Sequence, residues 1–265
     1  MKKVILVPDI HGRDFWKDIL PFVDECNKII FLGDYHDPYG DEGITQSQSL
    51  SNFNEIIAFA KQHSGKVTLL LGNHDLSYYS TENINSWDVF ANRHDWERHA
   101  TIQALFRDNH DLFQIISMVA LRDIGRNFLF SHAGVHPQWL KDNNIIKNFN
   151  ENTALHLICS HIDNMFQTED KNLLIALRSI GTSRGGRDSV GSMVWADCHE
   201  FFFEKDTPYT QVFGHTQQLK IDNEGHWVPD KPFVSGCNVC IDCHRCFYID
   251  EEGTIRDLKT DEEIY

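Results

Sequence analysis

Near its N-terminus the chain reads Val4-Ile5-Leu6-Val7-Pro8-Asp9-Ile10-His11-Gly12, and this segment is the strongest indication of the fold. Its first four residues form an apolar and largely β-branched run, which is typical of a buried strand. Asp9 and His11 follow at positions i and i+2, so in an extended chain their side chains leave the same face and can reach one ion. Gly12 then permits a tight turn. We therefore predict a buried strand that delivers two metal ligands at its carboxyl end.

Two more apolar runs, over residues 28–32 and 67–71, also read as strands. Apolar residues at helical spacing lie between the runs, over 13–26 and 46–63. This β-α-β-α-β order predicts an α/β fold with a parallel sheet that is buried on both faces. Ligands of such sheets gather beyond the carboxyl ends of the strands. Near the end of the chain, we expect residues 234–241 and 246–249 to pair as a terminal hairpin.

Five short blocks follow predicted strands, and each offers an oxygen or imidazole ligand: Asp9-Ile10-His11-Gly12, Gly33-Asp34-Tyr35-His36-Asp37, Gly72-Asn73-His74-Asp75, Ser131-His132-Ala133-Gly134 and Gly214-His215-Thr216. Carboxylate, amide and imidazole donors suit hard or borderline metals. Asp34 could bridge two ions with its two carboxylate oxygens, and Asn73 could bind through its amide oxygen. Two ions about 3.5–4 Å apart would clamp a phosphate and lower the pKa of a water. The blocks therefore indicate two-metal phosphoester chemistry.

In this order the blocks resemble the DxH, GDxxD, GNH(D/E), HxG and GH motifs of the calcineurin-like metallophosphoesterases, over residues 9–216. The chain is most similar to the phosphoprotein phosphatase branch, including its small bacterial and phage members. The resemblance implies a four-layer α-β-β-α sandwich of two mixed sheets flanked by helices. It also implies a general acid, His74, and a carboxylate that orients it, Asp37. It assigns six ligands to two metals: Asp9, His11 and Asp34 to the first, and Asp34, Asn73, His132 and His215 to the second.

One position departs from the family pattern. Where relatives usually have an arginine directly after the second block, this chain has Pro38. We expect Arg184 or Arg187, in a Gly- and Ser-rich loop, to bind the substrate phosphate instead, with Arg13 as a further candidate. A solvated surface charge is the alternative for each of them. Two residues inside the second block are expected at the rim of the site, Tyr35 and His36.

The strongest rival metal signal is a run of four cysteines spaced by three, Cys237, Cys240, Cys243 and Cys246. CxxC pairs occur in zinc sites, whereas an iron–sulfur run has a different last gap. Apolar residues alternate around these cysteines, which fits buried thiols in strands. A structural zinc site is therefore the minor alternative to buried thiols.

Composition narrows the class of protein. The chain has 265 residues, of which 41% are hydrophobic and 12% aromatic, and we expect one globular domain over 1–265. A formal net charge of −15 disfavours binding to duplex nucleic acid, which needs basic patches. The apolar run at the start is too short for a signal peptide, and no segment reaches the length of a membrane span. Because seven cysteines suit a reducing compartment, we expect a soluble cytoplasmic protein.

These observations favour a phosphomonoesterase that resembles serine/threonine protein phosphatases and uses metal-activated hydroxide with a histidine general acid. The resemblance favours manganese or iron, and zinc also suits the ligand set. The substrate could be a phosphoprotein, a small phosphate ester or a nucleotide. Hydrolysis of a dinucleoside polyphosphate is the next alternative, followed by a phosphodiesterase or nuclease. A degenerate metal-binding scaffold is the non-enzymatic alternative, and it is disfavoured because every ligand position is filled.

Overall fold

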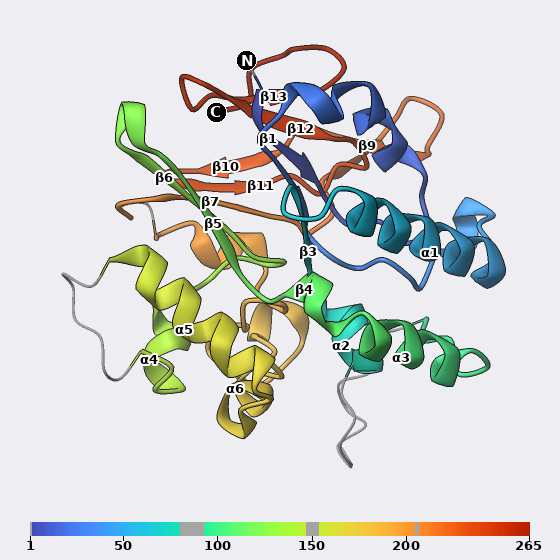
Figure 1. Cartoon of the computed structure of the whole chain (residues 1–265), viewed down its shortest axis with the longest axis horizontal. Coiled ribbons are helices and arrows are strands. Elements are labelled where there is room, and N and C mark those ends of the chain that lie inside the picture. Colours follow the sequence, from blue (N-terminus) through green and yellow to red (C-terminus); the bar gives the residue numbers. More distant parts are fainter. Residues whose placement is uncertain (1, 80–92, 147–153, 205–206) are drawn as a thin grey trace.

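Two mixed β-sheets form the centre of the computed structural model, which describes residues 2–79, 93–146, 154–204 and 207–265 (Figure 1). The first sheet has the strand order β13-β12-β1-β2-β3-β4. Its strands are, in chain order, β1 (Lys2–Val7), β2 (Lys28–Phe31), β3 (Val67–Leu70), β4 (Phe113–Gln114), β12 (Phe247–Asp250) and β13 (Ile255–Asp257). Strands β1 to β4 run parallel, whereas β12 is antiparallel to both of its neighbours.

The second sheet has the order β10-β11-β7-β6-β5. Its strands are β5 (Ser117–Leu121), β6 (Arg126–Phe130), β7 (Thr210–Phe213), β10 (Phe233–Ser235) and β11 (Asn238–Cys240). Strands β6, β7 and β11 run parallel, and an antiparallel strand lies at each edge. A separate small hairpin pairs β8 (Leu219–Ile221) with β9 (Trp227–Pro229).

Helices cover the outer faces of the sheets, which gives the predicted α-β-β-α order of layers. Figure 1 shows α1, α2 and α3 beside the first sheet and α4, α5 and α6 beside the second. The α-helices are α1 (Gln46–Gln62), α2 (Asn73–Tyr79), α3 (His99–Asp108), α4 (Pro137–Asp142), α5 (Leu155–Gln167) and α6 (Lys171–Ala176). The 3₁₀ turns are η1 (Phe15–Glu25), η2 (Gly40–Glu42), η4 (His110–Leu112), η5 (Arg122–Ile124), η6 (Thr182–Arg184) and η7 (Cys198–Phe201).

Strand β1 shows how the apolar runs build two cores. Val4 and Leu6 are buried in the cluster between the sheets, where they meet Phe128 of the second sheet. Ile5 and Val7 point the other way, into the cluster beneath the helices. Because successive side chains leave opposite faces of a strand, a continuous apolar run is what a strand buried on both faces requires.

The β-α-β-α-β start is confirmed, with one difference in the first helical segment. Residues Phe15–Glu25 form a 3₁₀ helix that contains Pro21. Proline has no backbone N–H to donate and its ring crowds the preceding turn, so it disfavours a regular α-helix here. The second helix, α1, begins as expected after Thr45, whose side chain accepts a hydrogen bond from the backbone of Gln48 in a capping box.

The predicted terminal hairpin of residues 234–241 with 246–249 is wrong. Strand β11 instead pairs with β10 and β7 in the second sheet, while β12 pairs with β1 and β13 in the first. A turn at Gly236, with φ of 57°, folds β10 back on β11. The chain then crosses between the sheets over residues 241–246. Each strand thereby buries its backbone between two neighbours, which a simple terminal hairpin could not provide.

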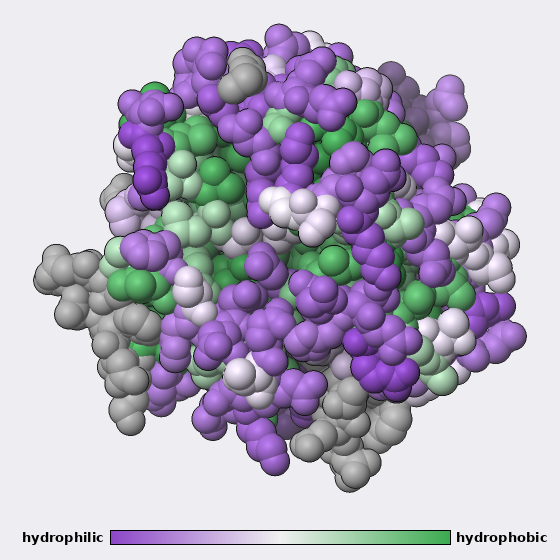
Figure 2. Space-filling view, in the orientation of Figure 1, coloured by the Kyte–Doolittle hydropathy of each residue, from purple (hydrophilic) through white to green (hydrophobic). Residues whose placement is uncertain are grey.

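Polar side chains cover most of the face shown in Figure 2, with smaller apolar areas between them. Among the described residues, no helix has both the length and the apolar character needed to cross a membrane.

Candidate metal centre

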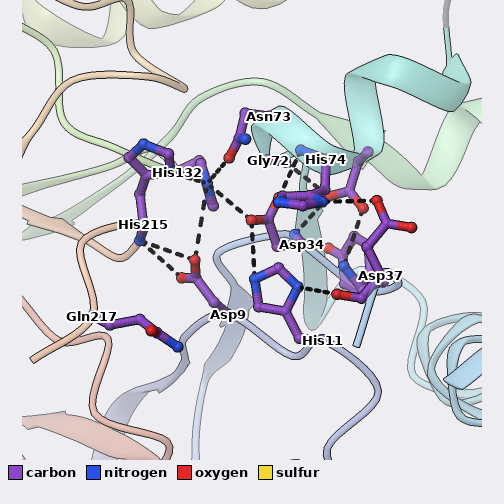
Figure 3. Close-up of polar contacts among 12 residues, drawn as sticks. Asp9, His11, Asp34, Asp37, Gly72, Asn73, His74, His132, His215 and Gln217 are labelled. Carbon is purple, nitrogen blue, oxygen red and sulfur yellow. Dashed lines mark hydrogen bonds and ion pairs between the residues drawn. The ribbon is translucent and has the colours of Figure 1, made fainter. Parts of the chain in front are cut away.

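The carboxyl ends of parallel strands bring the five sequence blocks together (Figure 3). Asp9 and His11 follow β1, Asp34 follows β2, and Asn73 begins α2 directly after β3. From the second sheet, His132 follows β6 and His215 follows β7. All of these side chains except that of His215 are at most 4% exposed. The two sheets therefore contribute to one buried polar cluster.

Asp34 lies at the middle of this cluster. Its Oδ2 is 3.3 Å from Nε2 of His11 and 3.5 Å from Nε2 of His132. Figure 3 shows the Asp34 carboxylate between these two imidazoles. Groups of side chains that could hold an ion form on both sides of it, namely His11, Asp34 and His74 on one side, and Asp34, His132 and His215 on the other. Asp34 is common to both groups, which is the arrangement a bridging carboxylate needs.

The surroundings of His11 fit a bound cation. Its Nδ1 lies 3.0 Å from the carbonyl oxygen of His36 and 3.1 Å from that of Asp37. Because carbonyls only accept, Nδ1 must carry the proton. Burial lowers the pKa of His11, which favours the neutral ring, so Nε2 presents a lone pair to the Asp34 carboxylate. Two acceptors held 3.3 Å apart are stabilised by a cation between them.

The second half of the cluster is also held by backbone groups. His132 donates from Nδ1 to the Leu32 carbonyl at 2.8 Å. Its Nε2 lies 3.1 Å from both Oδ1 of Asn73 and Nδ1 of His215. Nε2 of His215 is buried and has no hydrogen-bond partner among the described residues. Three atoms that could bind the second ion therefore lie close together: Nε2 of His132, Oδ1 of Asn73 and Nδ1 of His215.

Glycines in the blocks make room for the carboxylates. A Cβ on Gly72 would lie 2.1 Å from Oδ1 of Asp34, and one on Gly214 would lie 1.9 Å from Oδ1 of Asp9. With no side chain in the way, backbone N–H groups reach the same oxygens. His74 donates to Asp34 at 3.0 Å, and His215 donates to both oxygens of Asp9 at 3.0 Å. The glycines therefore let the backbone orient the predicted ligands.

Several ligand positions have an unusual backbone conformation. His11, Asp34 and His215 have φ of 45°, 54° and 67°, in the left-handed region that non-glycine residues rarely adopt. Such conformations persist where the surrounding structure holds them, and they concentrate at functional sites.

Burial and neighbouring charges shift the protonation of the cluster. Burial raises the pKa of Asp9. For Asp34, burial acts in the same direction, but His132, His74 and His11 outweigh it and hold the pKa well below its usual value. Burial, followed by the charge of Arg184, lowers the pKa of His215 well below its usual value. An ionised bridging carboxylate and a neutral imidazole are the forms that bind metals.

His74 and Asp37 form a hydrogen-bonded pair beside the cluster. Nδ1 of His74 lies 2.7 Å from Oδ2 of Asp37, and Asp37 is fully buried. The Tyr78 hydroxyl donates to the other oxygen, Oδ1, at 2.5 Å. Because Nδ1 is occupied by the carboxylate, Nε2 is the nitrogen left to exchange a proton with a ligand. Tyr78 was not among the predicted residues, although it lies four residues after His74 and hence on the same side of a helix.

The three predicted arginines lie in different surroundings. Arg184 lies beside the second half of the cluster, with Nη2 3.3 Å from the His215 carbonyl and Nε 3.0 Å from Asp197. Arg13 is buried and forms a bidentate pair with Glu42 at 2.6–3.1 Å. Arg187 is exposed on its loop.

The four cysteines of the CxxC run do not converge. Cys240, Cys243 and Cys246 are buried in three separate apolar clusters, and Cys237 lies at the turn between β10 and β11. The thiol of Cys240 donates to the carbonyl of Gly214 at 3.1 Å. This arrangement favours the interpretation as buried thiols.

The expectation that Tyr35 and His36 lie at the rim is wrong. Tyr35 is fully buried, stacks on Phe53 at 5.1 Å and donates to the Leu70 carbonyl. His36 is 1% exposed, and its Nε2 lies 3.3 Å from Asp95. Both side chains are therefore packed inside the fold, after the left-handed backbone conformation at Asp34.

Two residues outside the predicted set hold the site together. Asp75 accepts hydrogen bonds from the backbone N–H groups of Asp34, Tyr35 and Gly72. Burial and the Asp34 charge raise its pKa to about 8. Arg93 donates from Nε to the Asp37 carbonyl at 3.1 Å, and its Nη2 lies 3.4 Å from Nε2 of His74. Asp75 belongs to a quoted block and could have been found there, whereas no motif marks Arg93.

An open groove of about 1410 Å³ borders the cluster. It begins at Gly12 and Arg13, next to His11, and extends along Tyr39 and His244 to the β8–β9 hairpin. Trp227 on that hairpin lines the groove and is 66% exposed. The cluster is therefore buried in the fold but adjoins a large solvent-accessible surface.

Comparison with known proteins agrees with this geometry. A sequence profile of the calcineurin-like phosphoesterases matches residues 2–219. No curated protein matches the chain.

Among solved structures, a cold-active protein tyrosine phosphatase superposes with a TM-score of 0.58 at 14% identity, over 99% of this chain and 81% of that one. A protein serine/threonine phosphatase from Saccharomyces cerevisiae gives a TM-score of 0.44 at 11% identity, over 94% and 72% of the two chains. The first likeness supports the fold alone, and the second is too low to carry an argument. The match over most of the chain shows that it belongs to the calcineurin-like phosphoesterase family and is a metal-dependent phosphoester hydrolase.

Proposed function

We propose that this protein is a phosphomonoesterase in which His74 is the general acid. The observation that carries the proposal is the Asp37–His74 pair, whose 2.7 Å contact lies directly beside the ligand cluster. A histidine oriented by a buried carboxylate can donate a proton to an alkoxide leaving group, and the carboxylate stabilises the charged imidazole. Tyr78 holds the carboxylate from its other side, so the pair is oriented before substrate binds.

In this proposal the predicted side chains hold two ions. Asp9, His11 and Asp34 would bind the first ion, and Asp34, Asn73, His132 and His215 would bind the second. When bound, two such ions supply electrophilic stabilisation of the phosphoryl oxygens and lower the pKa of a water. Nitrogen and oxygen donors without thiolate suit manganese or iron, and zinc also fits.

The chain's own groups would complete the reaction. Backbone N–H groups orient the Asp9 and Asp34 carboxylates. His74 would protonate the departing oxygen from Nε2, because its Nδ1 is bound to Asp37. The adjoining groove of about 1410 Å³ exceeds the size of typical small-ligand pockets. Because the groove is open at the surface and starts beside His11, it could accept the rest of a larger molecule that carries the phosphate, such as a protein with a phosphorylated serine or threonine.

Substrate profiles of the manganese-loaded enzyme test this assignment. We expect turnover of p-nitrophenyl phosphate but not of bis(p-nitrophenyl) phosphate. Preferred cleavage of the diester would favour a phosphodiesterase, and preferred cleavage of diadenosine tetraphosphate would favour a nucleotide anhydride hydrolase. Absence of turnover on any of these esters, with two metals bound, would contradict the enzymatic proposal.

The role of His74 has its own test. Because the proposal assigns the first ion to Asp9, His11 and Asp34 and not to His74, His74→Asn should retain both metals. It should lose about 10²–10⁴-fold of the kcat for an alkyl phosphate, which needs leaving-group protonation. The loss should be much smaller for p-nitrophenyl phosphate, whose leaving group is already a weak base. Equal losses on both substrates would contradict the general-acid role.

A further inference from the structure

Arg93 has a guanidinium that faces the proton-donating end of His74. Its Nη2 lies 3.4 Å from Nε2 of His74, and its Nε donates to the Asp37 carbonyl at 3.1 Å. The guanidinium also stacks on Tyr39, with Cζ 3.6 Å from the ring centroid. Tyr39 in turn packs edge-on against His11 at 5.0 Å. Arg93 is thus held by the His74–Asp37 pair and by Tyr39, which packs against the predicted ligand His11.

The partners of Arg93 differ from those of the other two arginines near the site. Arg13 is paired with the Glu42 carboxylate at 2.6 Å, and Arg184 is paired with Asp197 at 3.0 Å. Within the described part of the chain, Arg93 donates to a carbonyl, lies 3.4 Å from an imidazole nitrogen and stacks on an aromatic ring. A guanidinium has five N–H donors, and these contacts engage only one edge of it.

We propose that Arg93 binds the phosphoryl group of the substrate, and this inference rests on the phosphomonoesterase function proposed above. If Nε2 of His74 faces the leaving oxygen, a guanidinium 3.4 Å from that nitrogen lies within reach of the same phosphoryl group. Planar paired N–H donors match phosphate oxygens, and a preoriented cation stabilises the charge that develops on them.

The position of Arg93 also accounts for Pro38. Proline follows Asp37 in this chain, and it cannot contribute a cation. Arg93 is anchored on the carbonyl of Asp37 itself, the atom directly before Pro38. Its backbone has φ of 76°, in the left-handed region that non-glycine residues rarely adopt. An arginine 55 positions beyond Pro38 in the sequence thus places a cation beside the Asp37–Pro38 peptide.

Binding of inorganic phosphate to the manganese-loaded protein tests the proposal without requiring turnover. Arg93→Ala should weaken phosphate binding by about 10- to 100-fold in calorimetric titrations and raise KM for p-nitrophenyl phosphate, with unchanged metal content. Arg93→Lys keeps the charge but not the planar fork, so its affinity should lie between those of Arg93→Ala and the wild type. Arg107→Ala is the matched control, because Arg107 is 63% exposed and paired with Asp108. It should bind phosphate like the wild type.

Several outcomes would overturn the proposal. Phosphate affinity of Arg93→Ala within about twofold of the wild type would do so. So would a selective loss of alkyl-ester turnover with unchanged phosphate affinity, because that result indicates only support of the His74–Asp37 pair. If Arg93→Ala does not fold, the same criteria apply to Arg93→Lys. If the wild type binds phosphate but hydrolyses no monoester, the proposed function fails, and the effect of Arg93 on phosphate binding still decides this inference.

Discussion

The Asp75 carboxylate accepts a hydrogen bond of 2.7 Å from the backbone N–H of Asp34. Asp75 also accepts from Tyr35 at 3.0 Å and from Gly72 at 2.8 Å. These bonds join the loop after β2 to the turn after β3. Because Asp34 is the shared member of both candidate ion-binding groups, a residue outside those groups fixes the geometry of both.

Replacement of Asp75 should loosen this junction. Asp75→Asn keeps the shape of the side chain but exchanges one accepting oxygen for a donor, which would face a backbone N–H. In urea titrations above the Asp75 pKa of about 8, where the wild-type group is ionised, we expect the free energy of unfolding to fall by about 1–3 kcal/mol, and the metal content to fall with it. Asp111→Asn, at an exposed position, is the control. Wild-type stability of Asp75→Asn would show that these hydrogen bonds do not hold the junction.

A substitution at Gly214 tests whether the Asp9 carboxylate must lie against the backbone of residue 214. The Cβ of Gly214→Ala would lie 1.9 Å from Oδ1 of Asp9, so Asp9 must move. We expect metal affinity to drop by about 10–100-fold, as measured by metal analysis after dialysis. Gly40→Ala is the matched control, because a Cβ there meets no atom within 4 Å. Full metal occupancy in Gly214→Ala would show that Asp9 is not needed in its observed position.

Metal removal should destabilise the fold. The Nε2 of His11 and the Asp34 carboxylate lie 3.3 Å apart, and the wild type should lose the cation that stabilises them when a chelator is added. Ligand at about 100 times its Kd contributes about 2.7 kcal/mol, so Tm should fall in calorimetry and recover with manganese. Asp34→Asn lacks the bridging charge and should respond much less to the chelator. An equal response of both proteins would place the stabilising metal elsewhere.

We expect the folded protein to lose stability in mild acid because of His94. Burial lowers the pKa of His94 from 6.5 to about 4 in the folded protein. As the pH falls from 6.5 toward 4, the unfolded chain therefore takes up a proton that the folded chain does not, and stability decreases. His94 stacks on Tyr78 at 4.1 Å, so His94→Phe keeps a ring there without the titration.

The measurement compares the free energy of unfolding of the two metal-free proteins between pH 4 and 7, over the range set by these two pKa values. The difference between wild type and His94→Phe should shrink as the pH falls, because only the wild type loses the contribution of the neutral imidazole. A constant difference across this range would contradict the lowered pKa.

The sequence identified the positions that the fold gathers into one cluster because the pattern behind them is local. A buried strand of a parallel sheet is an apolar run, and polar residues at its carboxyl end share an edge with those of neighbouring strands. Asp9, Asp34 and Asn73 follow this rule on the first sheet, and His132 and His215 follow it on the second. Asp75 was visible in the same blocks, but only its contacts reveal what it does.

The cysteine run shows where local spacing fails. Cys240, Cys243 and Cys246 are evenly spaced, yet they enter three different apolar clusters because the chain crosses from one sheet to the other between them. The same crossing between the sheets is the reason that the predicted terminal hairpin is wrong. Alternating apolar residues identify a strand but not its neighbours, because the pattern records which faces are buried and not which strands its backbone pairs with.

The class of fold, the strand ends and the types of ligand could therefore be predicted from the amino-acid sequence, since they depend on contacts among a few consecutive residues. The pairing of the strands, the contacts between carboxylates and imidazoles, and the identity of the arginine that faces His74 became visible in the folded chain. Arg93 is 19 residues from His74, and its orientation depends on Tyr39 and on the Asp37 carbonyl. Such a position is set by packing between segments far apart in the chain, which no local pattern records.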